Sequence, residues 1–490
     1  MKLIFEKSYP GRKGVSLPEM DVPQSDALPD ALRRTRQAEL PEVSEMDAVR
    51  HFTNLSRLNV GVDTCFYPLG SCTMKYNPKS HERIAALPGF AELHPLLPQL
   101  RHGAALTQGA LAVLHQAETF LCELLGFAAF TMQPLAGAHG ELTGVMLIAA
   151  YHRDHGGKRP IMLIPDSAHG TNPASATLAG FTTKSIPTDN QGNVDLDALR
   201  KALSPEVAGM MLTCPSTLGL YDSNIREVCR CVHEVGGLMY GDGANYNAIL
   251  GRLKPGDLGF DVIHINLHKT FSAPHGGGGP GAGPVGVNGK LVPYLPVSRV
   301  LKRADGTYTL EYDFPKSIGY VAPFYGNFAV ILKAYAYMLT LGREGMLRVS
   351  EAAVLNANYV RARLKHAYKE PFDRACMHEC VFSGKKQIQH GVHTLDVAKA
   401  LLDRGFHPPT IYFPLIVQEA IMIEPTETES KQTIDTFVEA MLEIAQLAEK
   451  QPEQLRNAPK NTPVARLDET RAARQLDLAD LGESKKTPNH

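Results

Sequence analysis

The chain has 490 residues, of which 44% are hydrophobic, and this is enough for a large domain, a smaller one and a substantial core. Its 50 basic residues stand against 51 acidic ones, so the charge balance argues weakly against nucleic acid or an anionic membrane as a main partner. No stretch suits a membrane span or a secretory signal, and eight cysteines scattered over so long a chain predict reduced thiols and a cytoplasmic location.

The first 60 residues contain many prolines and charges and little periodicity, which predicts an extended N-terminal arm that contacts a partner subunit. From residue 61 to 330, short apolar runs alternate with helical stretches, a pattern typical of a large α/β domain with a mostly parallel sheet. The expected strands are residues 161–164, 209–212, 238–240 and 263–265, with helices at 196–203 and 225–235.

Residues 331–450 are predicted to form a smaller C-terminal α+β domain. A long helix near 328–341 leads into it, and a last helix is expected near 430–450. The remaining residues, 451–490, are charged and contain prolines, which predicts a flexible tail.

Lys269 is the residue on which the functional interpretation depends. It follows an apolar stretch read as a strand, Val262–Leu267, and precedes a loop that contains the glycines Gly276–Gly279. Burial and nearby positive charge lower the pKa of a lysine and make imine chemistry feasible, while glycine lets a ligand approach the backbone closely. A lysine at a strand end is usually an ordinary surface residue. The glycine run favours a lysine that binds pyridoxal 5′-phosphate (PLP) as a Schiff base.

Asp242 ends the predicted strand before that of Lys269, and ligands bind at such strand ends in parallel sheets. A buried carboxylate there would keep the pyridine nitrogen of PLP protonated, although a simple turn aspartate is the ordinary alternative. Ala244, two residues on, is expected on the same side of an extended chain, where a small side chain leaves room for the ring.

Two more segments follow predicted strands. Residues 136–140 lie between a predicted strand at 128–132 and a predicted helix at 142–151. Unpaired backbone amides at the start of such a helix can bind a phosphate group. Close packing of the helix is the alternative explanation for the small residues there. His169 follows the strand at 161–164. Its imidazole is suited either to stack on the pyridine ring or to cap the helix that begins near Pro173.

These residues resemble the P-protein of the glycine cleavage system, glycine dehydrogenase (decarboxylating). The motifs that carry the resemblance are Pro68–Lys75, Ala138–Glu141, Asp242–Asn245, Asn266–Phe271 and the loop Pro274–Gly281. The resemblance extends over essentially the whole chain. The chain is similar to the C-terminal, PLP-bearing half of that enzyme, which many bacteria make as a separate subunit 2. It implies an aspartate-aminotransferase-like PLP fold (fold type I), a two-plus-two heterotetramer with subunit 1, and the lipoyl-bearing H-protein as a second partner.

The resemblance also implies roles for individual residues. Lys269 would carry PLP, Asp242 would hold the pyridinium nitrogen, and His169 would stack on the ring and serve in proton transfer. Three residues are implied to contact the phosphate of PLP: Gly137, Ala138 and Thr270. Thr217 is implied to contact the phenolic oxygen and His268 another part of the cofactor, while Tyr325 and Asn327 would complete the site across a subunit boundary. The implied substrate contacts are Ser71, Cys72 and Thr73.

The implied reaction is the decarboxylation of glycine, with transfer of the aminomethyl group to the lipoyl disulfide of the H-protein. The chain departs from the family at three positions. Cys214 and Ser216 stand where asparagine is frequent, which changes the hydrogen bonding expected around the ring, and Tyr320 stands where arginine is frequent, which removes a cationic contact.

Three other interpretations were weighed. Another fold-type I PLP enzyme, an aminotransferase or a cysteine desulfurase, would share Lys269 and Asp242, with Arg361, Arg363 and Arg404 available for a substrate carboxylate. A nucleotide-binding module would use residues 276–281, but the lysine and hydroxyl residue of a P-loop do not follow them. No metal site is predicted, because Cys376, His378 and Cys380 lack zinc-finger spacing and read as part of a strand with reduced thiols.

Overall fold

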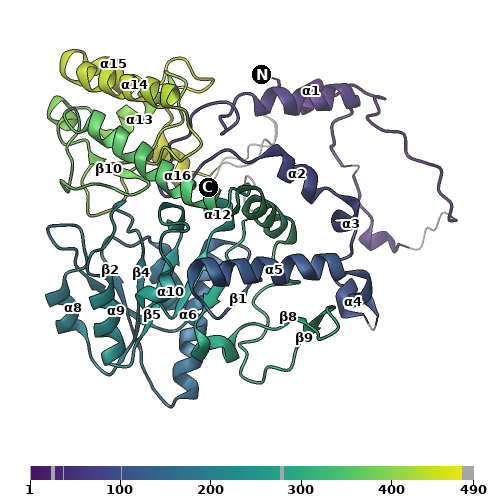
Figure 1. The fold of residues 1–490 in the computed structure, drawn as a ribbon. Helices are drawn as coiled ribbons and strands as arrows, with labels where there is room; N and C mark the ends of the chain where they lie inside the picture. The colour runs from purple at the N-terminus through teal and green to yellow at the C-terminus, as the bar shows by residue number, and fades with distance from the viewer. Residues whose placement is uncertain (1, 24–27, 37, 101, 276–280, 477–490) are drawn as a thin grey trace. The chain divides into compact units, whose positions relative to one another are not determined.

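The computed structural model describes residues 2–23, 28–36, 38–100, 102–275 and 281–476 (Figure 1). By its internal contacts the chain divides into two compact units, Met1–Thr64 and Cys65–His490. The four-part division expected from the sequence stays a prediction. In the described ranges, no helix combines the length and apolarity needed to cross a bilayer.

The first unit is an extended segment with one regular helix, α1 (Glu45–Ser56), and two 3-10 turns, η1 (Phe5–Lys7) and η2 (Asp30–Leu32). Helix α1 begins where the Ser44 hydroxyl accepts a hydrogen bond from the Asp47 amide, because a serine oxygen in that position satisfies an otherwise unpaired helix amide. The ion pair between Arg12 and Asp47 (2.8 Å) ties the start of this unit to α1.

The second unit is built on a seven-stranded sheet with the order β1-β7-β6-β5-β4-β2-β3. Only β7 runs antiparallel to its neighbours, so the sheet is mostly parallel, as predicted. The strands are β1 (Ala129–Thr131), β2 (Ile161–Pro165), β3 (Thr182–Ile186), β4 (Val207–Thr213), β5 (Leu238–Gly243), β6 (Val262–Ile265) and β7 (Val285–Val287).

Helices cover both faces of this sheet because its strands alternate their side chains between two cores. In β5, Met239 packs in one core with α5, α8, α9 and the start of α12, whereas Tyr240 packs in the other with α6 and α7. Figure 1 shows α8 and α9 on one side of the strands and α6 on the other. These helices are α5 (Gln108–Leu125), α6 (Gly137–Asp154), α7 (Thr171–Leu178), α8 (Leu196–Ala202), α9 (Ile225–Glu234) and α12 (Phe328–Leu364).

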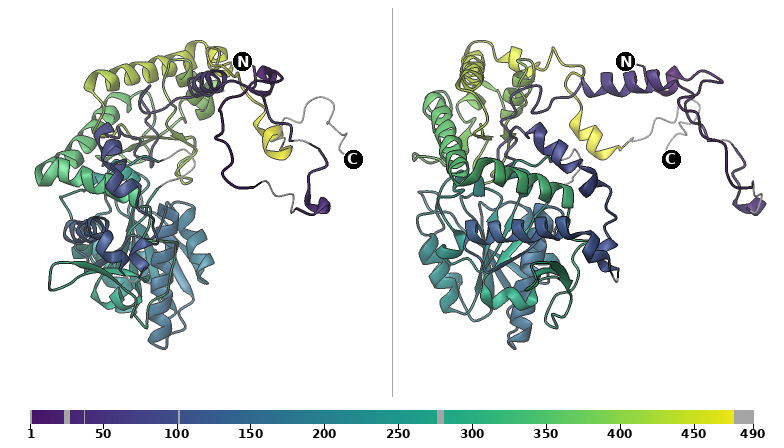
Figure 2. Two further views of the ribbon diagram at one scale, coloured as in Figure 1. Left: turned by 90° about the vertical axis from the view of Figure 1, so that its right-hand side faces the viewer. Right: turned by 45° about the vertical axis from the view of Figure 1, so that its right-hand side comes forward.

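A second, three-stranded antiparallel sheet has the order β10-β12-β11 and forms a separate core with α13, α14 and the end of α12. Helix α12 links the two sheets: it contacts α5 near its start and β10 and α14 near its end (Figure 2). The elements are β10 (Cys380–Ser383), β11 (Thr410–Ile411), β12 (Ala420–Ile423), α13 (Thr394–Leu402) and α14 (Lys431–Lys450).

Smaller elements complete the unit. They are α2 (Lys79–Ala85), α3 (Pro88–Ala91), η3 (Leu97–Gln99), α4 (Gly103–Leu106), η4 (Tyr246–Ala248), α10 (Pro255–Leu258), α11 (Leu267–Thr270), η5 (Gly289–Tyr294), β8 (Arg299–Lys302), β9 (Tyr308–Glu311), η6 (Gln387–His390), α15 (Pro452–Arg456) and α16 (Glu469–Arg474).

Candidate active site

The site lies at the carboxyl ends of neighbouring parallel strands. Asp242 in β5 pairs in register with Thr213 of β4 on one side and with His264 of β6 on the other. The loop after β2 adds His169, the first turn of α7 adds Asn172, and Lys269 follows β6. Since parallel strands end at the same edge of a sheet, residues that are far apart in the sequence meet there.

Lys269 lies on the one-turn helix α11, directly after β6. The strand expected to run to Leu267 ends at Ile265, because the Lys269 and Thr270 amides already donate to the Asn266 carbonyl (3.1 and 3.2 Å) in a helical turn. The half-buried amine of Lys269 donates a hydrogen bond to the Ser71 carbonyl (2.8 Å). The predicted glycines Gly276–Gly279 lie outside the described residues.

Asp242 is buried, and its carboxylate is held in the ionised form. Burial alone would raise its pKa, but His264, the Ala244 amide, Asn172 and Lys269 together lower the pKa below its usual value. The Ala244 amide donates to Oδ1 (2.9 Å), and the Asn172 amide group donates to Oδ2 (3.2 Å). Ala244 therefore lies in a turn just past β5, and the extended chain assumed for it was wrong.

A second buried carboxylate, Glu141 of α6, lies in the same network. It accepts hydrogen bonds from Asn172 Nδ2 (2.9 Å) and from the Thr171 hydroxyl (2.8 Å), so Asn172 bridges Glu141 and Asp242. Burial and the charge of Asp242 raise the pKa of Glu141 to about 7. No motif in the sequence pointed to Glu141 as a titrating group, since only the fold brings it to Asp242.

His169 lies on the loop after β2, near the network. Its Nδ1 accepts a hydrogen bond from the Thr171 amide (3.2 Å). Burial lowers its pKa and outweighs the opposing effect of Asp242, so the imidazole is neutral. The same contact with Thr171 caps the start of α7, so the structure leaves room for both interpretations of this histidine.

The first turn of α6 forms a cradle beside Lys269. The helix begins after Ala136, earlier than predicted, so Gly137 and Ala138 offer amides that have no acceptor within the helix. A Cβ on Gly137 would lie 2.5 Å from Asn266 Nδ2, which shows how closely this turn approaches the segment that carries Lys269. The Thr270 hydroxyl is buried without a hydrogen-bond partner.

Two histidines beside the lysine are neutral. The rings of His268 and His275 meet edge to face, with centroids 5.0 Å apart. Burial, with further contributions from neighbouring positive charge, lowers the pKa of His268 to about 3 and that of His275 to about 4. His275 Nε2 donates to the Cys72 carbonyl (2.9 Å), so this loop contacts the Ser71–Thr73 turn.

Ser71, Cys72 and Thr73 form that turn, and they lie beside Lys269 as expected of residues near the same site. Ser71 and Thr73 adopt left-handed backbone angles (φ 64° and 51°), which cost about 1–3 kcal/mol each for residues with side chains. Buried carboxylates of Glu379 and Glu424 accept hydrogen bonds from the turn. Sequence reasoning missed both, because they lie more than 300 residues away in the chain.

The other predicted residues make contacts of their own. Thr217 is buried and its hydroxyl donates to the Ser167 carbonyl, while Asn327 precedes α12 without a capping hydrogen bond and donates to the Gly281 carbonyl (3.2 Å). The Tyr325 hydroxyl is buried without a hydrogen-bond partner. At the positions where the chain departs from the family it resembles, Cys214 is buried, whereas Tyr320 is exposed.

The prediction that Cys376, His378 and Cys380 all lie on a strand was wrong for two of the three. Cys380 begins β10, but Cys376 and His378 lie in the loop before it, because the pairing with β12 starts only at Cys380. All eight cysteines are free, as predicted.

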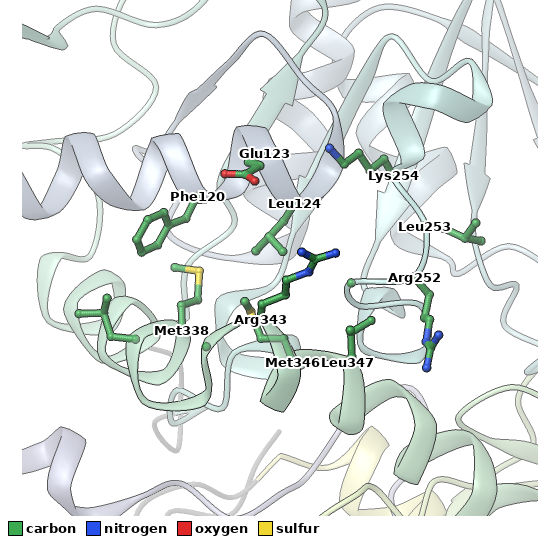
Figure 3. A pocket seen from close by; sticks show the side chains of 13 residues that line it. Phe120, Glu123, Leu124, Arg252, Leu253, Lys254, Met338, Arg343, Met346 and Leu347 are labelled. Atoms are coloured by element: carbon green, nitrogen blue, oxygen red, sulfur yellow. The ribbon is translucent and has the colours of Figure 1, made fainter.

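A separate cavity of about 560 Å³ lies between α5, α12 and the loop at residues 251–254. Figure 3 shows the Arg343 and Lys254 side chains at this cavity beside Leu124 and Glu123. None of the residues that line it belongs to the groups around Lys269. The Lys269 amine and the buried carboxylates Asp242 and Glu141 therefore lie at the strand ends and not at this cavity.

Comparisons with known proteins agree with this geometry. By fold, the chain is similar to a glycine decarboxylase (P-protein) of the glycine cleavage system in inhibitor-bound form, with a TM-score of 0.70 and 21% identity over 85% of this chain and 93% of that one. It is also similar to a cysteine desulfurase from Thermococcus onnurineus NA1, with a TM-score of 0.58 and 16% identity over 78% of this chain and 95% of that one. The chain therefore has the fold-type I α/β fold, with a large, mostly parallel sheet and a smaller C-terminal sheet.

The sequence comparisons are more specific. Residues 349–464 match the family model described as glycine dehydrogenase, C-terminal domain. A glycine dehydrogenase (decarboxylating) subunit 2 from Caldanaerobacter subterraneus is 58% identical over 96% of this chain and 97% of its own length. One from Halalkalibacterium halodurans is 56% identical over 96% of each. The chain belongs to the family of glycine dehydrogenase (decarboxylating) subunit 2.

The residues present fit PLP. An aldehyde needs an amine, the pyridine nitrogen needs an ionised carboxylate, and the phosphate needs unpaired donors. Lys269, the ionised Asp242, and the first turn of α6 with the unpartnered Thr270 hydroxyl supply these three groups.

Proposed function

We propose that this chain is the PLP-bearing subunit of a glycine decarboxylase, the P-protein of a glycine cleavage system. It removes carbon dioxide from glycine and passes the aminomethyl group to a lipoyl group on the H-protein. The observation that carries the proposal is the convergence of the Lys269 amine and the ionised Asp242 carboxylate at one sheet edge, in a chain 58% identical to a named subunit 2. Subunit 1 is the proposed partner, in a two-plus-two assembly.

Lys269 would hold PLP through its amine, Asp242 would hold the pyridine nitrogen, and Gly137, Ala138 and Thr270 would hold the phosphate. PLP, when bound, accepts the electron pair that remains on the substrate carbon when carbon dioxide leaves. Asp242 supports this chemistry by holding a proton on the ring nitrogen, which its lowered pKa allows.

The surrounding residues orient the amine and move protons. The Ser71 carbonyl accepts from Lys269 Nζ (2.8 Å) and fixes its direction. His169, held through Nδ1 by the Thr171 amide, presents its imidazole for stacking and proton transfer. Thr171 also donates to Glu141, so the position of His169 is coupled to the carboxylate pair Glu141 and Asp242 through hydrogen bonds.

The remaining predicted contacts complete the proposal. Thr217 would hold the phenolic oxygen of PLP, His268 and Ala244 would contact the cofactor, and Tyr325 and Asn327 would complete the site at a subunit boundary. Ser71, Cys72 and Thr73 contact glycine. The neutral state of His268 and His275 avoids a cluster of positive charges around the amine.

The proposal is tested by replacing Lys269. The chain, produced together with subunit 1 and supplied with PLP, is expected to show the visible absorbance of bound PLP and to exchange the carboxyl group of glycine with bicarbonate when lipoylated H-protein is present. Lys269→Ala is expected to lose that absorbance and at least about 10³-fold of the exchange, because the other buried amine nearby, that of Lys75, is held in an ion pair with Glu427 (2.7 Å).

Lys365→Ala is the matched control, since Lys365 is an exposed lysine at the end of α12 and is expected to retain both signals. Borohydride reduction followed by peptide mass mapping should find PLP on Lys269. Lys269→Ala protein that kept both the absorbance and the exchange would contradict the assignment, and turnover of a keto acid without H-protein would favour an aminotransferase.

A further inference from the structure

Two carboxylates from the small sheet hold one turn of the chain beside Lys269. Glu379 Oε2 accepts a hydrogen bond from the Ser71 amide (2.7 Å), and Glu424 accepts from both the amide (2.9 Å) and the hydroxyl (2.7 Å) of Thr73. Glu379 directly precedes β10 and Glu424 directly follows β12, and these strands pair at Cys380 and Ile423. Neighbouring strands thus aim two acceptors at the same turn.

The pair is buried, and among the described residues the positive charge that acts on both carboxyl groups is that of Lys269. Glu379, Glu424 and His378 have no solvent exposure. Among the described residues, the ion-pair neighbour of both carboxylates is His378, whose Nε2 lies 3.7 Å from Glu379 and 3.9 Å from Glu424. Both nitrogens of His378 and Oε1 of Glu379 lack hydrogen-bond partners. Buried carboxylates of this kind are unfavourable for stability, which points to a role at the site.

The turn needs such support. Ser71 and Thr73 are left-handed, and a β-branched residue such as Thr73 rarely adopts this conformation unless its surroundings impose it. Three hydrogen bonds from Glu379 and Glu424 impose it here. The result is that the Ser71 carbonyl meets Lys269 Nζ at 2.8 Å and that Cys72 lies half-buried between the two held residues.

We propose that Glu379 and Glu424 are positioning residues that hold the Ser71–Thr73 turn closed over the amine of Lys269. They act through their acceptor oxygens, and their consequence for catalysis rests on the function proposed above. The competing explanation is a bound cation, because ligand atoms of His378, Glu379 and Glu424 lie within 4.8 Å of one another. Substitution by glutamine separates the two, since an amide oxygen still accepts a hydrogen bond but carries no charge.

The first experiment uses the chain with its partner subunit and without PLP, so it does not depend on the proposed activity. Glu379→Leu and Glu424→Leu are expected to raise the rate of Cys72 alkylation by iodoacetamide at least about tenfold, because the turn loses its acceptors. Peptide mapping identifies Cys72, and the half-buried Cys122 serves as the internal reference. Hydrogen exchange at the Ser71 and Thr73 amides should accelerate in parallel.

The control variants sharpen the result. Glu379→Gln and Glu424→Gln are expected to alkylate within about threefold of the parent rate, because each keeps an acceptor for the turn. Asp222→Leu removes another buried carboxylate that accepts backbone amides, those of Val194 and Asn224, and is expected to leave Cys72 unchanged. Should the leucine variants fail to fold, Thr73→Val and Thr73→Ser test the Glu424 contact from the turn.

The second readout uses the enzyme loaded with PLP. The leucine variants are expected to lower kcat for glycine–bicarbonate exchange at least about tenfold, and the glutamine variants to restore most of it. Leucine variants with unchanged Cys72 alkylation would overturn the proposal. Glutamine variants as reactive as the leucine variants, with about one equivalent of metal in the parent protein, would assign the cluster to a cation instead.

Discussion

At the scale of single residues, Lys75 makes a buried ion pair beside the segment that carries Lys269. It is buried, and its amine donates to the Thr270 carbonyl (3.0 Å) and pairs with Glu427 (2.7 Å). Burial alone would lower its pKa, but Glu427, with Tyr337, outweighs burial and raises the pKa to about 12. Lys75 therefore links the motif at 68–75 directly to the helix that carries Lys269.

Replacing Lys75 by methionine is expected to cost about 3–5 kcal/mol, because the buried Glu427 loses its counter-charge. The double variant Lys75→Met, Glu427→Met should cost less than Lys75→Met alone. Urea denaturation followed by circular dichroism measures both. Lys431→Met, which breaks an exposed pair with Asp435, is the control and is expected to cost at most about 1 kcal/mol.

The pH dependence of Lys75 has a definite sign. Its folded pKa lies above the unfolded value of 10.5, so the folded state binds the proton more tightly and the pair stabilises fully below about pH 10. That contribution is lost as the pH rises from about 10.5 to 12. The parent should therefore lose more stability over this range than Lys75→Met, and equal losses would contradict the assigned protonation.

The sequence could predict which residues lie close together when each of them follows a recognisable strand. Asp242 and Lys269 were expected near one another because each follows a strand of a parallel sheet, and β5 and β6 are indeed neighbours. Glu141, Glu379 and Glu424 carried no comparable signal, because a buried carboxylate in the middle of a helix or beside a strand looks like any other acidic residue. Only long-range packing reveals what each of them faces.

At the scale of elements, long periodic segments were predicted well and interruptions poorly. The expected strands at 161–164, 209–212, 238–240 and 263–265 correspond to β2, β4, β5 and β6, and the helix near 430–450 corresponds to α14. The antiparallel β7 was missed because three residues give little periodicity. The helix expected near 328–341 is confirmed, because the backbone leaves the helical conformation at Gly342, and a second helical stretch, which was not predicted, then runs to Leu364.

Gly342 has φ 58° and ψ −172°, a backbone conformation accessible essentially to glycine alone. Gly342→Ala is therefore expected to destabilise the protein by about 1–3 kcal/mol, although an added Cβ would meet nothing within 4 Å. Thermal unfolding measures the change. Gly89→Ala, at an equally open position with a negative φ, is expected to be neutral or stabilising, and equal losses in both variants would contradict the backbone explanation.

At the scale of the whole molecule, no large apolar side chain is buried among the residues of the first unit that the structure describes. Its large apolar side chains are exposed, although such groups normally bury themselves or contact a partner. They are Leu3, Phe5, Tyr9, Val15, Leu17, Met20, Val22, Leu28, Leu32, Leu40, Met46, Val49, Phe52, Leu55, Leu58 and Val60. The composition of the first 60 residues predicted an arm of this kind but not which residues would be exposed.

This exposure supports the expectation that the arm contacts a partner subunit. Met46, Val49, Phe52 and Leu55 recur every three residues on α1 and are exposed, so they form an apolar stripe that winds halfway around the helix, with Val49 and Phe52 at its centre. A protein that must associate with a second chain can cover such a stripe at the interface, which removes its apolar surface from water. The partner named by the family, subunit 1, is the proposed occupant.

The double variant Val49→Ser, Phe52→Ser is expected to weaken assembly with subunit 1 by at least about tenfold, since truncating a central aromatic contact commonly has this effect. Sedimentation of the two co-purified chains over a concentration series measures it. The circular dichroism of the isolated chain should not change, because both side chains are exposed. Asn54→Ser, on another face of α1, is the control. Unchanged assembly of the double variant would show that this stripe does not contact subunit 1.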